Sequence, residues 1–169
     1  MRARPSPLLL AALVGAALAL LATDRLLADG QSSTPPDERV FGTWQLNAAK
    51  STFNPGPPYR NQTRVYERHE TGVKATITTT YGDGHSSRVE YVADYDSLEY
   101  PVTGSPDYDS IRLKRVDAFT AEAVLMHAGK EFATARRTIS EDGKAMTIAF
   151  QVNLFAGSRV NNVMVYDRR

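Results

Sequence analysis

The chain of 169 residues contains no cysteine. Disulfides and a lipid on an N-terminal cysteine are therefore excluded. Histidine is also scarce, and His69, His85 and His127 lack ligand-type neighbours at the tight spacing of zinc sites. Since no serine or cysteine nucleophile is paired with a histidine base, we predict no metal, no cofactor and no enzymatic activity.

An excess of charge of either sign is missing as well. The formal net charge is +1, and it becomes −1 when Arg2 and Arg4 of the N-terminal segment are removed. Nucleic-acid binding needs clustered lysine and arginine that displace counterions from phosphates. Only short pairs such as Arg136-Arg137 occur, so we predict no nucleic-acid partner.

Long apolar runs are absent after residue 22. Before it, Arg2 and Arg4 precede the apolar stretch from Leu8 to Ala22, which is typical of a signal peptide and shorter than the ~20 residues of a membrane-spanning helix. We therefore predict a signal peptide over residues 1–22 and an exported protein, either periplasmic or extracellular. The alternative is an uncleaved leader, which would be the protein's only attachment to a membrane.

Residues 23–39 contain the polar stretch Ser-Ser-Thr-Pro-Pro, which is typical of a flexible linker. The folded domain is predicted over residues 40–169. There, threonine, valine, isoleucine and tyrosine alternate with polar residues at period two, and Gly-rich turns such as Gly82-Asp83-Gly84 separate the runs. The nearest candidate for a helix is the stretch from Ala118 to Ala128, but its flanking turns and short length favour a strand. About ten strands are expected, including an irregular one around Leu98 to Val102 that contains Pro101.

An open sheet of ten strands would leave two long edges unpaired, whereas closure removes both. We therefore predict an all-β fold, a single antiparallel up-and-down β-barrel of about 8–10 strands. Alternation then places one set of side chains inside the barrel. The predicted inner faces are Val73/Ala75/Ile77, Val89/Tyr91, Ile111/Leu113, Phe119/Ala121/Ala123/Leu125, Met146/Ile148/Phe150/Val152 and Val163/Val165. For the strand over residues 131–140, both faces are mixed and neither is preferred.

The opening Gly42-Thr43-Trp44, the meander of hairpins and the final Val163-Met164-Val165-Tyr166 resemble the calycin superfamily, which contains lipocalins and fatty-acid-binding proteins. The stretches Gly42 to Phe53, Pro101 to Pro106 and Asp142 to Lys144 also look like exported bacterial lipocalin-like proteins. The resemblance implies a cup that holds a small hydrophobic molecule. It also implies a basic side chain, Arg159 or Arg168, over Trp44.

Two features depart from that resemblance. Fatty-acid-binding proteins carry a helical lid after the first strand, whereas this chain has the proline-rich segment from Asn47 to Asn61. Their ligand carboxylate is held by an arginine and a tyrosine two residues apart on the last strand. Here Tyr166 matches the tyrosine but Met164 stands at the arginine position, so Arg136 or Arg137 would have to supply the charge.

A ligand site needs an apolar cavity with a few converging polar groups. Buried arginine needs a partner, which a ligand anion can be. The candidate ligand-binding residues are Tyr66, Tyr81, Tyr91, Arg115, Arg136, Arg137, Phe150, Met164 and Tyr166. For each, an ordinary structural role on the rim or outer face is the competing interpretation.

Three functions follow, in decreasing order of support. The first is an exported lipocalin-like protein that holds a small hydrophobic or amphipathic molecule inside its barrel. The second is a non-catalytic envelope or interaction protein whose barrel is filled by its own side chains, and the third is an enzyme on the same fold. The cavity distinguishes the first from the second, since a ligand site is ~300 Å³ or larger.

Overall fold

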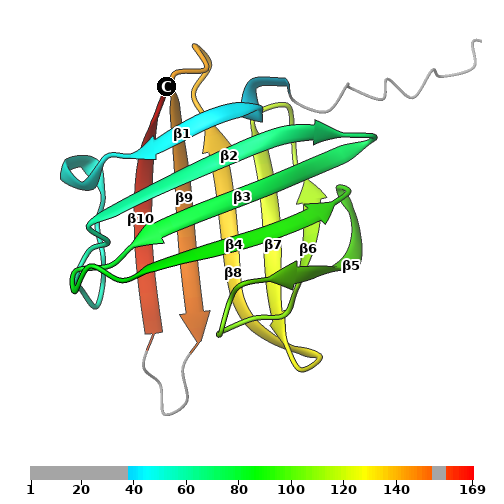
Figure 1. Ribbon diagram of the computed structural model, residues 1–169. Coiled ribbons are helices and arrows are strands. Elements are labelled where there is room, and N and C mark those ends of the chain that lie inside the picture. The colour runs from blue at the N-terminus through cyan, green and yellow to red at the C-terminus, as the bar shows by residue number, and fades with distance from the viewer. Residues whose placement is uncertain (1–37, 154–158) are drawn as a thin grey trace, which may run out of the picture. The chain divides into compact units, whose positions relative to one another are not determined.

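The computed structural model describes residues 38–153 and 159–169 (Figure 1). The predicted signal peptide and most of the predicted linker lie outside these ranges. Within the described ranges, no helix combines the length and the apolar character that crossing a bilayer requires. The only helical turns in these two ranges are two short 3₁₀ segments, η1 (Glu38–Val40) and η2 (Ala48–Lys50).

Ten strands form one closed antiparallel barrel in which each strand pairs with its neighbours in the chain, and β10 pairs with β1 (Figure 1). The predicted all-β up-and-down barrel is therefore confirmed. The strands are β1 (Gly42–Leu46), β2 (Asn61–His69), β3 (Gly72–Thr80), β4 (Ser86–Ala93), β5 (Asp96–Thr103), β6 (Ser110–Arg115), β7 (Thr120–His127), β8 (Lys130–Ile139), β9 (Ala145–Asn153) and β10 (Arg159–Arg168).

Trp44 on β1 anchors one end of the barrel. Its side chain is 0% exposed, and its indole N–H donates to the carbonyl oxygen of Val40 at 2.8 Å. The guanidinium of Arg168 lies 4.2 Å from the centre of the Trp44 ring and donates to the carbonyl of Phe41 at 2.7 Å. Arg168 is thus the basic residue that covers Trp44. The Trp44 side chain fills this end of the barrel and lines neither of the two internal chambers described below.

Period-two alternation places most of the predicted inner residues correctly. The buried set includes Val73, Ala75, Ile77, Val89, Tyr91, Ile111, Leu113, Ala121, Leu125, Met146, Ile148 and Val152. These side chains meet inside the barrel because residues directly opposite each other on paired strands point to the same face. On β8, the undecided strand, Ala133, Ala135, Arg137 and Ile139 share the inner face.

The prediction for β10 is wrong. Val163 is 43% exposed, whereas Met164 and Tyr166 are buried. Met164 stands opposite Ile148 of β9, and Tyr166 stands opposite Met146, so the larger side chains join the core. Val163 instead exchanges two backbone hydrogen bonds of 2.8 Å with Thr52 of the β1–β2 loop.

The join with the fewest paired residues in the barrel lies between β4 and β5. Only Glu90 with Thr103 and Tyr91 with Val102 are paired there, whereas β3 and β4 pair along eight residues. β5 is also irregular against β6, with a register shift between Asp96 and Glu99. The expectation of an irregular strand around Pro101 agrees with this pairing, because proline has no N–H for the ladder.

Candidate ligand-binding site

The interior of the barrel holds two adjoining chambers. The inner chamber has a volume of about 70 Å³ and the outer chamber about 190 Å³. Four residues line both chambers and lie where the two adjoin: Arg64, Ile77, Tyr108 and Phe150.

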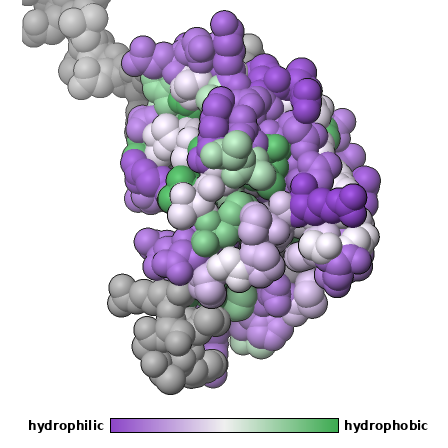
Figure 2. Space-filling model, turned by 90° about the vertical axis from the view of Figure 1, so that its left-hand side faces the viewer, coloured by the Kyte–Doolittle hydropathy of each residue, from purple (hydrophilic) through white to green (hydrophobic). Residues whose placement is uncertain are grey.

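The outer surface in the view of Figure 2 is largely hydrophilic, with apolar side chains gathered near its centre.

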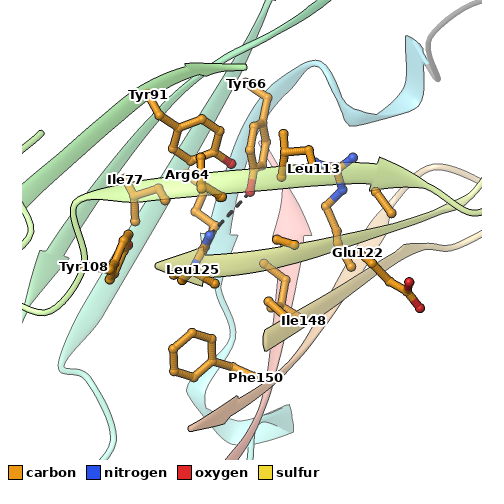
Figure 3. Close-up of a pocket in the computed structure, with 15 residues that line it drawn as sticks. Arg64, Tyr66, Ile77, Tyr91, Tyr108, Leu113, Glu122, Leu125, Ile148 and Phe150 are labelled. Carbon is orange, nitrogen blue, oxygen red and sulfur yellow. Dashed lines mark hydrogen bonds between the residues drawn. The ribbon is translucent and has the colours of Figure 1, made fainter. Parts of the chain in front are cut away.

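The inner chamber is lined mainly by apolar and aromatic side chains (Figure 3). Its lining comprises Arg64, Tyr66, Ile77, Tyr91, Tyr108, Ile111, Leu113, Ala121, Glu122, Ala123, Leu125, Ala135, Arg137, Ile148 and Phe150. The alanines come from β7 and β8, where side chains are short enough to leave space. This chamber therefore suits an apolar group next to two guanidinium groups.

The outer chamber is more polar and carries neutral hydrogen-bonding groups. Gln62, Thr79, Ser87 and Asn162 contribute to its wall, and Tyr59 and Tyr81 add aromatic rings. The side-chain amide of Gln62 donates to the hydroxyl of Thr79 at 2.7 Å. This chamber suits a polar but uncharged part of a ligand.

Arg64 enters the barrel because of its register on β2. It stands opposite buried Trp44 on β1 and opposite buried Ile77 on β3, so its side chain shares their inner face. Its Nε lies 3.0 Å from both the Gln62 side-chain oxygen and the Tyr166 hydroxyl. Its Nη1 lies 3.4 Å from the hydroxyl of Tyr66, as the dashed line in Figure 3 marks.

Arg137 enters from β8, across the barrel from β2. Its Nη2 donates to the hydroxyl of Tyr95 at 2.8 Å, and its guanidinium lies 5.3 Å from the centre of the Tyr66 ring. Its Nε is buried without a hydrogen-bond partner. Arg64 and Arg137 therefore approach Tyr66 from different strands.

Both arginines remain charged. Burial acts to lower the pKa of Arg64, but the hydroxyls of Tyr166 and Tyr66 act in the opposite direction and leave it well above its ordinary value. Burial likewise opposes the charge on Arg137, while Tyr95 and Tyr66 raise its pKa above the ordinary value. Each guanidinium is thus held by neutral hydroxyl or amide groups.

No carboxylate faces these two arginines from the described lining of the chambers. The lining contains two acidic residues, Glu122 and Asp107. Glu122 points away from the inner chamber in Figure 3 and accepts from Arg136 at 2.5 Å, and Asp107 is exposed. The described lumen therefore carries an excess of positive charge.

The neighbouring tyrosines respond to this charge in different ways. Burial would raise the pKa of Tyr66, but Arg64 and Arg137 outweigh it and lower that pKa. Burial raises the pKa of Tyr91 well above its ordinary value, and it raises the pKa of Tyr166 to about 12. Tyr66 is accordingly the phenol of these three whose ionised form the two arginines favour.

The structure brings most of the predicted ligand residues together. Tyr66, Tyr91, Arg137 and Phe150 line the inner chamber, and Tyr81, Met164 and Phe150 line the outer one. The Tyr166 hydroxyl contacts Arg64 and Gln62.

Two predicted arginines lie elsewhere. Arg115 packs 4.4 Å from the centre of the Tyr95 ring, outside the lining of both chambers. Arg136 is exposed and pairs with Glu122 on the outer surface.

Sequence reasoning missed Arg64, Gln62 and Tyr108. A signal for the first two was present, because Tyr66 was expected inside and residues two apart on a strand share a face. The apolar side chain of Val65 lies on the opposite face of this strand, and it made that face look like the inner one. Tyr108 lies in the loop before β6, where alternation makes no prediction.

The three histidines lie away from the chambers' walls and are exposed. His85 stacks on Tyr81 with ring centres 4.1 Å apart, and its Nδ1 lies 2.5 Å from a carboxylate oxygen of Asp83. Among the residues that the structure describes, no three or more His, Cys, Asp or Glu side chains form a group suited to a metal ion.

The closed ten-stranded antiparallel barrel is compatible with a calycin-like fold. Comparison with protein-family models, with curated proteins and with solved structures finds no match for this chain.

Proposed function

We propose that this protein is an exported, lipocalin-like binding protein whose barrel holds a small amphipathic anion. The observation that carries the proposal is the pair of buried guanidinium groups, Arg64 and Arg137, beside an apolar chamber without an inward carboxylate. A buried charge without a counter-charge costs several kcal/mol. A ligand anion removes this cost through charge-assisted hydrogen bonds.

The walls of the two chambers define the rest of the ligand. Leu113, Leu125, Ile148 and Phe150 offer apolar surface next to the arginines, and the outer chamber offers neutral hydrogen-bonding groups. Because the chambers are about 70 and 190 Å³, the ligand is small. A short-chain or single-ring acid with a hydroxyl or amide substituent meets all three requirements.

The chamber volumes favour the second candidate, a non-catalytic envelope or interaction protein with a filled barrel. Ligand sites usually occupy ~300–1,000 Å³, and each chamber is smaller than that. In that case Arg64 and Arg137 would be held by their tyrosine partners alone, and no added molecule would change the stability of the protein.

The experiment is a thermal-shift and calorimetric titration with short carboxylates and their neutral amides, matched in length. The acids should raise the melting temperature and the amides should not. At 100 times Kd, the stabilisation expected from linkage is ~2.7 kcal/mol. Arg64→Met should abolish the response to the acids.

The matched control is Arg60→Met, which removes one exposed positive charge from the same region of the chain. It should leave the response unchanged. No response to any acid, or an equal response in Arg64→Met, would favour the filled barrel.

Export is part of the proposal and has its own measurement. The motive is the predicted signal peptide over residues 1–22. After expression in a host with a secretory pathway, N-terminal sequencing of the protein outside the cytoplasm should begin at Thr23. Recovery of the full chain from the cytoplasm would contradict export.

A further inference from the structure

Five side chains form an alternating row inside the barrel, here named the arginine–tyrosine row: Arg64, Tyr66, Arg137, Tyr95 and Arg115. Arg64 contacts the hydroxyl of Tyr66, and the guanidinium of Arg137 lies near the Tyr66 ring. Arg137 then donates to the hydroxyl of Tyr95, whose ring also packs against Arg115. Three positive charges are thus connected by two tyrosine side chains.

The sheet register places the far end of this row. Arg115 of β6 stands opposite Ala121 of β7, and Ala121 stands opposite Arg137 of β8. The two arginines are therefore separated by one strand, which corresponds to ~10 Å between their backbones. Ala121 lies between them and lines the inner chamber. The Tyr95 ring lies 4.4 Å from the guanidinium of Arg115 and 5.7 Å from that of Arg137, so the two cationic groups share one aromatic neighbour.

Two guanidinium nitrogens at this place are buried and have no hydrogen-bond partner. They are Nη2 of Arg115 and Nε of Arg137, and they are the only such side-chain atoms among the described residues. A buried donor without an acceptor costs ~1–3 kcal/mol, and more when the group is charged. Folded proteins seldom leave such donors without a partner.

Nearby acidic side chains do not supply the missing acceptor. Arg112, on the outer face of the same strand, pairs with Glu99 at 2.7 Å, and Glu122 pairs with Arg136. Both ion pairs lie on the outer surface, where their side chains are between 40% and 50% exposed. Neither Arg115 nor Arg137 has a described carboxylate within ion-pairing distance.

We propose that Arg115 and Arg137 form a subsite for a doubly charged tetrahedral oxyanion, of the phosphate or sulfate type. A tetrahedral dianion presents several acceptor oxygens and two charges, whereas a carboxylate presents two oxygens and one charge. It satisfies both unpaired donors and offsets the mutual repulsion of the row. The group is either a free ion or the head group of an amphipathic ligand.

The subsite rests on the proposed function in one respect, since the ligand reaches it through the same lumen. Calorimetry and thermal shift should compare inorganic phosphate, sulfate and chloride at equal ionic strength and pH 8, where phosphate is dianionic. Phosphate and sulfate should raise the melting temperature above that in chloride. Arg115→Met should weaken phosphate binding at least tenfold.

The control is Lys114→Met, which removes one positive charge at the neighbouring, exposed position of β6. Phosphate affinity should stay within twofold of the wild type. An equal loss in both variants, or equal melting temperatures in phosphate and chloride for the wild-type protein, would overturn the subsite. The wild-type comparison decides the matter even where a variant does not fold.

A second set of titrations distinguishes a free oxyanion from the head group of a larger ligand. It also tests this subsite independently of the proposed function. It titrates inorganic phosphate, octyl phosphate and octanoate into the wild type, Arg64→Met and Arg115→Met. Tighter binding of octyl phosphate than of inorganic phosphate assigns the subsite to a head group, and equal binding assigns it to a free ion.

The two variants report on different claims. Octanoate binding that depends on Arg64 tests the proposed function. Phosphate binding that depends on Arg115 tests the subsite, which is overturned when phosphate binds Arg115→Met and wild type equally, whatever octanoate does.

Discussion

Trp44 combines burial, a hydrogen bond to Val40 and a cation contact from Arg168 at one end of the barrel. Loss of a large buried aromatic ring costs ~3–5 kcal/mol, because its packing contacts are lost and a cavity remains. Its position shows how one residue links the first strand, the last strand and the turn before the barrel.

We therefore expect Trp44→Ala to lower the free energy of unfolding by ~3–5 kcal/mol, measured by urea unfolding with far-ultraviolet circular dichroism. Leu98→Ala is the control, since Leu98 is 64% exposed and surface changes stay within ~0.5 kcal/mol. A loss below ~1 kcal/mol for Trp44→Ala would contradict its anchoring role.

Tyr166 links stability to pH through its burial. Its pKa is raised to about 12 in the folded protein, whereas an unfolded tyrosine has a pKa of ~10. A neutral Tyr166 therefore stabilises the fold fully below pH ~10, and this stability is lost as the pH rises through about 12. The pKa of Tyr66 is lowered by Arg64 and Arg137, so its ionisation acts in the opposite direction.

We expect the free energy of unfolding to decrease more steeply between pH ~10 and ~12 in the wild type than in Tyr166→Phe. The two-unit difference in pKa corresponds to ~3 kcal/mol over that range. Urea unfolding at a series of pH values measures it. Equal slopes in the wild type and in Tyr166→Phe would count against this assignment.

Gly104 ends β5 at a point where the chain passes close to β4. Its φ is +79°, and a Cβ at this position would lie 1.9 Å from the carbonyl oxygen of Arg88. Gly84, in the β3–β4 turn, has a similar φ of +91° but open space around it. The two glycines therefore share the conformational requirement and differ in the close approach.

Gly104→Ala should destabilise the protein by at least ~2 kcal/mol, from the positive φ and the clash together. Gly84→Ala should cost only the conformational part, ~1–2 kcal/mol. Thermal unfolding of both variants measures the difference. Similar losses would show that the backbone near Arg88 relaxes without penalty.

The strands show where local pattern succeeds and where it fails. β3, β4 and β9 follow simple alternation because apolar residues occupy one face almost completely. β2 and β10 depart from this pattern. The polar side chains of Gln62, Arg64 and Asn162 face the interior, whereas Val65 and Val163 lie on the outer face. Hydrophobicity alone predicts the opposite face for such strands, and only pairing with neighbouring strands resolves it.

The barrel as a whole is uneven in its pairing. β9 and β10 pair along nine residues, whereas β4 and β5 pair at two. Tyr91 of β4 lines the inner chamber and also lies at an outer depression with Val92, Pro101 and Thr103. The β4–β5 join is thus the thinnest part of the wall around the candidate site.

We expect amides at the β4–β5 join to exchange hydrogen with solvent faster than those between β9 and β10, since fewer ladder hydrogen bonds must open. Hydrogen–deuterium exchange with mass spectrometry measures this, with peptides from β9 as the internal reference. A ligand that fills the inner chamber should slow exchange at the join. Uniform exchange around the barrel would contradict a weak join.

By itself, the sequence determined the all-β class, the number of strands and most inner faces, because period-two alternation and turn residues act locally. Only the tertiary structure decided which arginines face the lumen. Arg64 and Arg137 line it because each occupies an inner register position set by its paired strands, while Arg136, one residue from Arg137, faces solvent. Closure of the barrel brings Arg64 of β2 and Arg137 of β8 to one cavity, and no local pattern encodes that convergence.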